Sequence, residues 1–184
     1  MDLPIELKEA LFYGNGRHKR CYLHPHNDAR CIKMAYSADG QKDLDREIKY
    51  LKVLKNKGKN YDVLPKYFGT VETNLGTGYI YELIADDGGT KSLTLEDYLH
   101  NETLLRNNLQ MIITELNKLK NALIDNEIIT MDIFPENIIV QYGGHRRVIK
   151  CVLSMIWAVL CSFLWNIISA VWRNLKFATT GIDL

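Results

Sequence analysis

Residues 132–137, DIFPEN, carry an acid and an amide whose spacing suits phosphoryl-transfer chemistry. The Asp132 carboxylate could accept the proton of a substrate hydroxyl, and the Asn137 amide oxygen could bind Mg²⁺. In one class of phosphoryl-transfer site, both groups come from a single loop with the spacing D-x-x-x-x-N. We therefore predict Asp132 as the catalytic base and Asn137 as a metal ligand. A plain proline turn framed by apolar residues is the competing interpretation.

Gly14 and Gly16 form a G-x-G pair between two segments that are predicted as strands. Residues without side chains let backbone N–H groups approach phosphate oxygens closely. The pair is therefore a candidate for cofactor binding. An ordinary hairpin turn would contain the same residues, so the pair gains meaning only beside other phosphate-binding groups.

Lys33 and Glu47 are the next two candidates along the chain. Lys33 lies on a predicted strand, on the same face as Cys31, where its ammonium could contact the α and β phosphates of a nucleotide. Glu47 lies on the following predicted helix, beside the apolar Ile48, where its carboxylate could hold Lys33 in place. Each residue alone could be a solvated charge, but their positions on a strand and the very next helix favour a shared site.

The elements that would position these residues follow from the hydrophobic periodicity. Alternating residues predict strands first, a helical period follows up to Gly58, and a capping-box pattern at Thr94 opens a helical region. This order indicates an α+β fold, with a strand-rich lobe over 1–84, a linker over 85–91 and a helical lobe over 92–150. The predicted strands are 8–13, 19–24, 29–36, 67–73, 79–84, 138–141 and 146–149, and the predicted helices are 41–57, 94–99 and 103–126.

The order of these motifs resembles the protein-kinase-like fold. The longer segments GNGRHKRCYLHPHNDARCIKM, LPKYFGTVETNLGTGYIYELI and DIFPENIIVQ resemble the bacterial family of the PhoP regulatory network protein YrbL, over roughly residues 8–141. The resemblance implies a two-lobed kinase-like fold with a shortened helical C-lobe. It also implies ATP and Mg²⁺ as cofactors and phosphotransferase activity, but no phosphoacceptor. Lys19 stands where protein kinases have the third glycine of the phosphate loop.

The strand after the DIFPEN loop departs from the resemblance. The family implies an Ile-Asp-Gly segment there, whose Asp is the main Mg²⁺ ligand, but residues 147–151 read RVIKC. No acidic residue occurs between Glu136 and Asp183. Because Mg²⁺ relies on carboxylate and phosphate oxygens, we expect phosphotransfer to be weakened or lost. The alternative is a non-catalytic nucleotide-binding or regulatory interaction module, with or without a membrane tether.

Residues 151–172 form an uncharged run of 22 residues. As a helix this run would measure about 33 Å, against a bilayer core of about 30 Å. Three interpretations stay open: a single-pass membrane anchor, a buried C-lobe helix, or a tail out of register with the family after a frameshift near 141–147. Translating the coding DNA in its other frames would test the third.

The charge is distributed unevenly around a formal total of +1. Residues 1–136 carry −3 and residues 137–184 carry +4. The near-neutral total argues against a dedicated nucleic-acid binder. The four cysteines lack metal or CxxC spacing, and the N-terminus lacks an apolar leader, so we expect a cytoplasmic protein with reduced thiols, apart from any C-terminal anchor.

Overall fold

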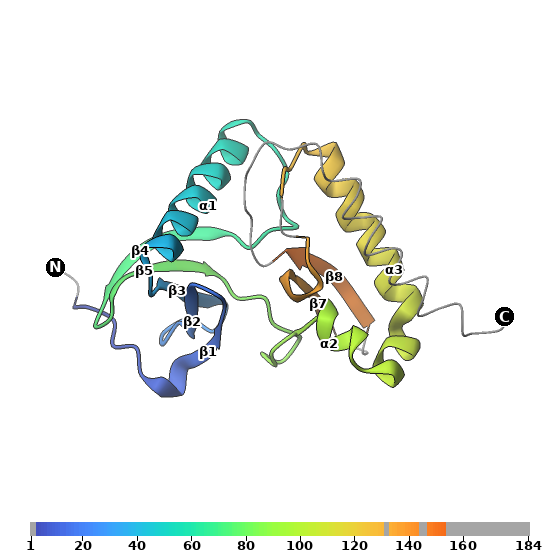
Figure 1. Cartoon of the computed structure of the whole chain (residues 1–184), viewed down its shortest axis with the longest axis horizontal. Coiled ribbons are helices and arrows are strands. Elements are labelled where there is room, and N and C mark those ends of the chain that lie inside the picture. Colours follow the sequence, from blue (N-terminus) through green and yellow to red (C-terminus); the bar gives the residue numbers. More distant parts are fainter. Residues whose placement is uncertain (1–2, 131–132, 144–146, 154–184) are drawn as a thin grey trace.

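The computed structural model describes residues 3–130, 133–143 and 147–153. Its N-terminal lobe, residues 12–82, contains a five-stranded antiparallel sheet in the order β1-β2-β3-β5-β4 and one long helix, α1, which lies against the sheet (Figure 1). The strands are β1 (Phe12–Asn15), β2 (Lys19–Leu23), β3 (Arg30–Ala35), β4 (Tyr67–Thr73) and β5 (Gly76–Glu82). A 3-10 turn, η1 (Glu9–Leu11), precedes β1.

Successive side chains of β3 face opposite sides of the sheet. Ile32 and Met34 point to one face, where they form a small buried cluster with Leu7 and Tyr22. The residues between them face the other way, toward α1 and the larger core, as expected from the period of two in a strand. Lys33 thereby reaches the side of the sheet that α1 covers.

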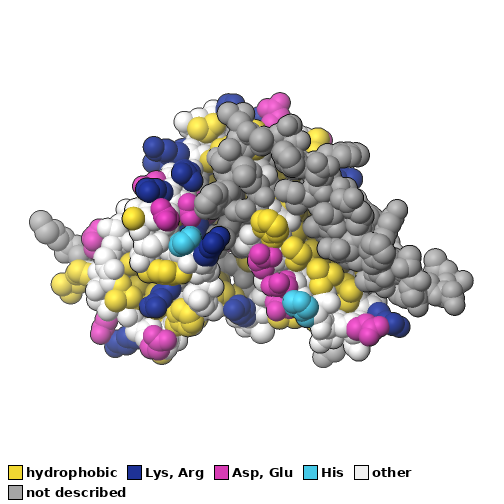
Figure 2. Space-filling view, in the orientation of Figure 1, with side chains coloured by type: hydrophobic (Ala, Val, Ile, Leu, Met, Phe, Trp, Pro, Cys, Tyr) yellow, Lys and Arg dark blue, Asp and Glu magenta, His cyan; other side chains and the backbone are white. Residues whose placement is uncertain are grey.

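Helix α1 (Ala38–Asn56) has local signals at both ends. The Ser37 side chain accepts a hydrogen bond from the Gly40 backbone at 3.1 Å, which caps the first turn. Gly58 ends the helix with φ of 63°, a left-handed conformation that glycine adopts without a steric penalty. Leu44, Leu51 and other apolar residues of α1 are buried against the sheet, while basic side chains gather over its outer surface (Figure 2).

The C-terminal lobe, residues 93–153, combines two helices with a three-stranded sheet in the order β6-β7-β8. Thr94 and Asp97 form the predicted capping box at the start of α2 (Leu95–Leu99). The long helix α3 (Glu102–Asp125) buries a stripe that includes Ile112 and Leu119. The other elements are β6 (Leu93–Thr94), the 3-10 turn η2 (Pro135–Asn137), β7 (Ile138–Gly143) and β8 (Arg147–Leu153).

Most predicted elements are confirmed, with shifted ends. The strand predicted over 8–13 is wrong at its start, because the Leu11 backbone N–H donates to the Lys8 carbonyl at 2.9 Å and closes the turn η1. The predicted connection over 74–78 shrinks to a tight turn, since Gly76 already pairs with Thr73 at the start of β5. Strand β6 was not predicted; it forms by pairing Leu93 with Val140 of β7.

Strand β8 also changes the interpretation of the apolar run over 151–172. Its antiparallel pairing with β7 continues to Leu153, which lies opposite Ile138. Residues 151–153 therefore belong to a strand and not to a helix, and the predicted boundary at residue 150 falls inside β8. Residues 154–172 lie outside the described part of the chain. Within the described part, no helix combines the length and apolarity needed to span a bilayer.

A single large core joins the two lobes. It contains Leu44 and Leu54 of α1, Tyr81 of β5, and Ile112 and Leu123 of α3, all of them buried. Because burial of apolar area is the main stabilising term in folding, this shared core fixes the lobes against each other.

Candidate functional site

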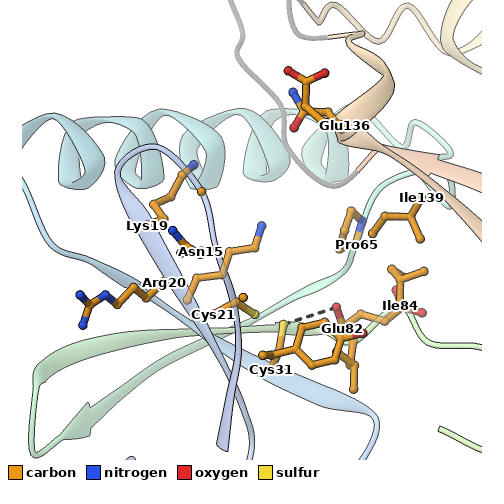
Figure 3. A pocket seen from close by; sticks show the side chains of 16 residues that line it. Asn15, Lys19, Arg20, Cys21, Cys31, Pro65, Glu82, Ile84, Glu136 and Ile139 are labelled. Atoms are coloured by element: carbon orange, nitrogen blue, oxygen red, sulfur yellow. Dashed lines mark hydrogen bonds between the residues drawn. The ribbon is translucent and has the colours of Figure 1, made fainter. Parts of the chain in front are cut away.

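A cavity of about 320 Å³ lies between the lobes. The β1–β2 hairpin and β3 line one side, the end of β5 lines another, and η2 with β7 lines the third (Figure 3). The volume falls within the range of small-ligand pockets. Gly14, Gly16, Lys33 and Asn137, four of the six predicted site residues, line this cavity.

Lys33 and Glu47 are paired, as the sequence predicts. Lys33 Nζ lies 3.2 Å from Glu47 Oε1, and the two side chains are only 13% and 2% exposed. Lys33 Nζ also lies 4.1 Å from the centroid of the Tyr81 ring. Burial is the largest single effect and would lower the pKa of Lys33. The Glu47 carboxylate, with smaller contributions from Cys31 and Cys21, nevertheless holds this pKa above its ordinary value. Lys33 therefore carries its charge at neutral pH beside the cavity.

Lys19 is a third member of this charged cluster, and sequence reasoning missed it as a site residue. It opens β2, lines the cavity, and places its Nζ 3.6 Å from Glu47 Oε2. Burial lowers the pKa of Lys19, and the attraction of Glu47 offsets only part of that effect. Its position after the glycine pair was the available signal, but a lysine near a turn is usually a solvated charge.

The two glycines of the hairpin are not required by packing inside the chain. A methyl group on Gly14 would come no closer than 3.7 Å to any atom, and one on Gly16 no closer than 4.0 Å. Gly40 differs, because a methyl group there would lie 2.3 Å from the His18 carbonyl oxygen. The fold therefore has room for a Cβ at Gly14 and Gly16, whereas the small size of Gly40 lets α1 pack against the hairpin.

The hairpin is held from the β3–α1 connection. The Tyr36 hydroxyl donates to the Gly16 and Arg17 carbonyls, and the Tyr36 backbone N–H donates to the His18 carbonyl at 3.3 Å. The Ser37 hydroxyl lies 3.4 Å from His18 Nδ1. The turn that carries Gly16 is therefore positioned by the segment that leads from Lys33 to Glu47.

The other end of the cavity is apolar. Ile84, Pro65 and Ile139 face it from the end of β5, the α1–β4 connection and β7 (Figure 3). Cys21 and Cys31 line the cavity from the neighbouring strands β2 and β3, and the Cys31 thiol donates to the Glu82 carbonyl at 3.8 Å (Figure 3). The hydrogen bond between the two thiols raises the pKa of Cys21 and lowers that of Cys31. An apolar end opposite two lysines suits a ligand with a flat ring system and an anionic tail.

The side of the site near the DIFPEN segment is described only in part. Asp132, the predicted base, lies outside the described residues. Asn137 is buried at the end of η2 and lines the cavity, and the exposed Glu136 lines it too. Within the described part of the chain, no three His, Cys, Asp or Glu residues form a metal-binding cluster. The described donors therefore fit an anionic ligand better than they fit a resident Mg²⁺ ion.

Solved structures with a similar fold include two structures of WbdD. A high-resolution structure of WbdD has a TM-score of 0.55 at 15% identity, and a co-crystal structure of WbdD with a kinase inhibitor has a TM-score of 0.53 at 14% identity. Each match covers 90% of this chain but only 37% of the WbdD chain. At this identity the likeness concerns the fold alone, and it supports the kinase-like two-lobed architecture.

Sequence comparison gives a closer relationship. The chain is 38% identical over 154 residues to the YrbL proteins of Escherichia coli and Shigella flexneri, covering 83% of this chain and 73% of each relative. The model of the family described as PhoP regulatory network protein YrbL matches residues 5–155. The match includes all of β8 and extends beyond the range 8–141 expected from the motifs. It also spans residues 141–147, where the frameshift interpretation places the loss of register with the family. The chain belongs to the PhoP regulatory network protein YrbL family.

Proposed function

We propose that this protein binds an adenine nucleotide, ATP, in the cavity between its lobes. The Lys33–Glu47 ion pair carries the proposal, because it holds a buried positive charge at a cavity that Gly14, Gly16 and Asn137 also line. The phosphates would lie near Lys33 and the glycine turn. The adenine ring would lie at the apolar end, beside Ile84 and Ile139.

The proposed chemistry of the bound nucleotide is weak or absent phosphotransfer. Asp132 would act as the base, and Asn137 would be one ligand of the Mg²⁺ that accompanies ATP. The residues that follow β7 contain no acid before Asp183, so the Asp that the family resemblance implies as the main metal ligand is missing from the sequence. The second candidate function is therefore a non-catalytic regulatory module that uses nucleotide binding to change its interactions.

Nucleotide binding is tested by thermal unfolding of the full chain with and without ATP, in the presence and absence of Mg²⁺. A ligand at 100 times its Kd stabilises the native state by about 2.7 kcal/mol, which corresponds to a rise of a few degrees in Tm for a chain of this size. We expect this rise in the wild-type protein and a smaller rise in Lys33→Met. Absence of an ATP-dependent rise in the wild-type protein would contradict the proposal.

A matched control is available on α1. Lys42 lies on the same helix as Glu47, but its side chain is 67% exposed and pairs only with Asp39. Lys42→Met removes the same charge without touching the cavity, so its ATP-dependent rise in Tm should equal that of the wild-type protein.

Catalysis is tested separately by following release of phosphate from ATP. We expect little or no turnover by the wild-type protein with Mg²⁺. Substantial turnover that disappears in Asp132→Asn would show an active phosphotransferase and would contradict the expected weakening. No turnover, together with an ATP-dependent rise in Tm, would favour the regulatory module.

A further inference from the structure

We infer that Lys19 is a second phosphate-contacting lysine of the cavity, so that the nucleotide polyphosphate is held between two ammonium groups. This inference rests on the proposed nucleotide binding and extends it to a residue that the family resemblance presents only as a departure. Its first basis is placement. Lys19 follows the glycine turn, lines the cavity, and extends its amine from the β1–β2 hairpin toward α1 (Figure 3).

The second basis is the burial of the Lys19 ammonium and its shortage of hydrogen-bond acceptors. The Lys19 side chain is 8% exposed, yet its Nζ makes no hydrogen bond among the described residues. Glu47 Oε2, the nearest opposite charge, is 3.6 Å away and also lacks a hydrogen-bond donor there. A buried ammonium with three donors and a single acceptor at 3.6 Å is unfavourable, because hydrogen bonds repay little of its desolvation. Phosphate oxygens in the cavity would supply the missing acceptors.

The third basis is the balance of charge. Glu47 faces both Lys19 and Lys33, so a single carboxylate serves two ammonium groups. The nearby Asp43 is buried too, but it pairs with Arg46 at 3.8 Å. Glu47 therefore offers one negative charge to the two ammonium groups that it holds, in a region screened from water. An anion at the adjoining cavity would balance the second positive charge.

Because Glu47 holds both lysines, either ammonium group could contact the phosphates. The two carboxylate oxygens hold the two ammonium groups separately, one lysine on Oε1 and the other on Oε2. Loss of Lys33 would therefore leave Lys19 positioned by the same carboxylate. We expect Lys33→Met to weaken ATP binding and not to abolish it until Lys19 is also replaced.

The experiment compares ATP with adenosine, because only a phosphate contact changes their relative affinities. Isothermal titration of the full-length wild-type protein, Lys19→Met, Lys33→Met and the double variant gives both affinities. A charge-assisted hydrogen bond contributes enough that Lys19→Met should weaken ATP binding by roughly 10- to 100-fold. Adenosine affinity should stay within about twofold of wild type, since its ring contacts the apolar end. The control Lys42→Met should leave both affinities unchanged.

The outcomes separate the inference from the proposed function. If the wild-type protein binds neither ATP nor adenosine, the proposed function fails. If it binds ATP and a folded Lys19→Met keeps the wild-type ratio of ATP to adenosine affinity, the inference alone fails. Equal losses for both ligands would show that Lys19 only positions Glu47, which also overturns the inference. Lys19→Gln, which keeps a polar group of similar length, gives the same comparison should Lys19→Met not fold.

Discussion

The buried ion cluster of the N-terminal lobe contrasts with an exposed ion pair of the C-terminal lobe. In the N-terminal lobe, Lys19, Lys33 and Glu47 come from two strands and a helix and meet in a buried cluster. In the C-terminal lobe, Glu102 and Arg106 form an ion pair between residues four apart on α3, and both side chains are exposed. A buried cluster assembled from several elements needs tertiary structure to exist, whereas an exposed pair on one helix does not.

The lobes also differ in what they contribute to the proposed nucleotide site: one contributes mainly phosphate-binding groups and the other the predicted catalytic residues. The groups proposed to hold phosphates lie in the N-terminal lobe. The C-terminal lobe contributes Asn137 and the exposed Glu136 to the same cavity, while the predicted base, Asp132, lies outside the described residues. Under the proposed function, weakened metal binding in the second lobe would leave intact a nucleotide site built mainly by the first.

The largest expected effect comes from removing the shared carboxylate of the buried cluster. Glu47→Ala leaves two ammonium groups, on side chains 8% and 13% exposed, without their partner. Leaving a buried charge unpaired costs about 3–5 kcal/mol, so urea unfolding should show a loss of this size. Lys33→Met combined with Glu47→Leu removes one charge of each sign and should recover part of the stability.

The matched change in the C-terminal lobe is Glu102→Ala. Because this exposed pair lies at i,i+4 on α3, its removal should cost about 0.5 kcal/mol or less. Equal losses from Glu47→Ala and Glu102→Ala would mean that the cluster is solvated in the native protein. The contrast between the lobes would then disappear.

A smaller effect is expected where the lobes are tied together. The Ile129 backbone N–H, just before the DIFPEN loop, donates to the Tyr50 hydroxyl of α1 at 2.6 Å. Tyr50→Phe leaves that N–H without its partner and should destabilise the protein by about 1–2 kcal/mol in urea unfolding. The transition should stay a single cooperative step, because the large core spans both lobes.

Tyr36→Phe is the control for the Tyr50→Phe variant. Its hydroxyl also donates to backbone carbonyls, but the residue is 51% exposed, so water can replace the lost hydrogen bonds. The cost should be below that of Tyr50→Phe. Two separate transitions in the Tyr50→Phe protein, or a larger loss from Tyr36→Phe, would show that the lobes are not joined at this point.

Local patterns predicted the long elements of both lobes. Leu44, Leu51 and Leu54 repeat with a helical period and are all buried, so the helix over 41–57 was recognisable without its neighbours. Strand β6 could not be predicted this way, because two residues become a strand only by pairing with β7. The turn η1 was missed because its apolar Leu11 fits a strand equally well until the hydrogen bond to Lys8 is known.

The same distinction between local pattern and tertiary pairing explains which site residues could be predicted. Lys33 and Glu47 each lie on a strong local element, so their meeting could be predicted from the order of strand and helix. The burial of Lys19 depends on the register that sets it opposite Ala35 and on the distance of α1 from the hairpin. Neither quantity is encoded near Lys19 in the sequence, and only the folded chain shows that it shares Glu47 with Lys33.

The smallest expected effect concerns Tyr13, in β1, where the N-terminal lobe meets the linker. The Lys91 ammonium of the linker lies 5.2 Å from the centroid of the Tyr13 ring, and the Tyr13 hydroxyl is buried without a hydrogen-bond partner among the described residues. Burial, with smaller contributions from the thiols of Cys21 and Cys31 and from Asp86, raises the pKa of Tyr13 to about 12. Tyr13→Phe should therefore be close to neutral for stability below about pH 9, where tyrosine is un-ionised in both states.

The sign of the pH dependence follows from this raised pKa. Above about pH 10 an unfolded tyrosine loses its proton, while native Tyr13 keeps it up to about pH 12, so the unfolded state binds fewer protons and stability falls in this window. Tyr13→Phe removes that contribution, and its free energy of unfolding should fall less steeply than that of the wild-type protein between about pH 9 and 11. Urea unfolding of both proteins across this range measures the difference. Parallel curves would show that Tyr13 titrates as it does in the unfolded chain, and hence that water reaches this edge of the cavity.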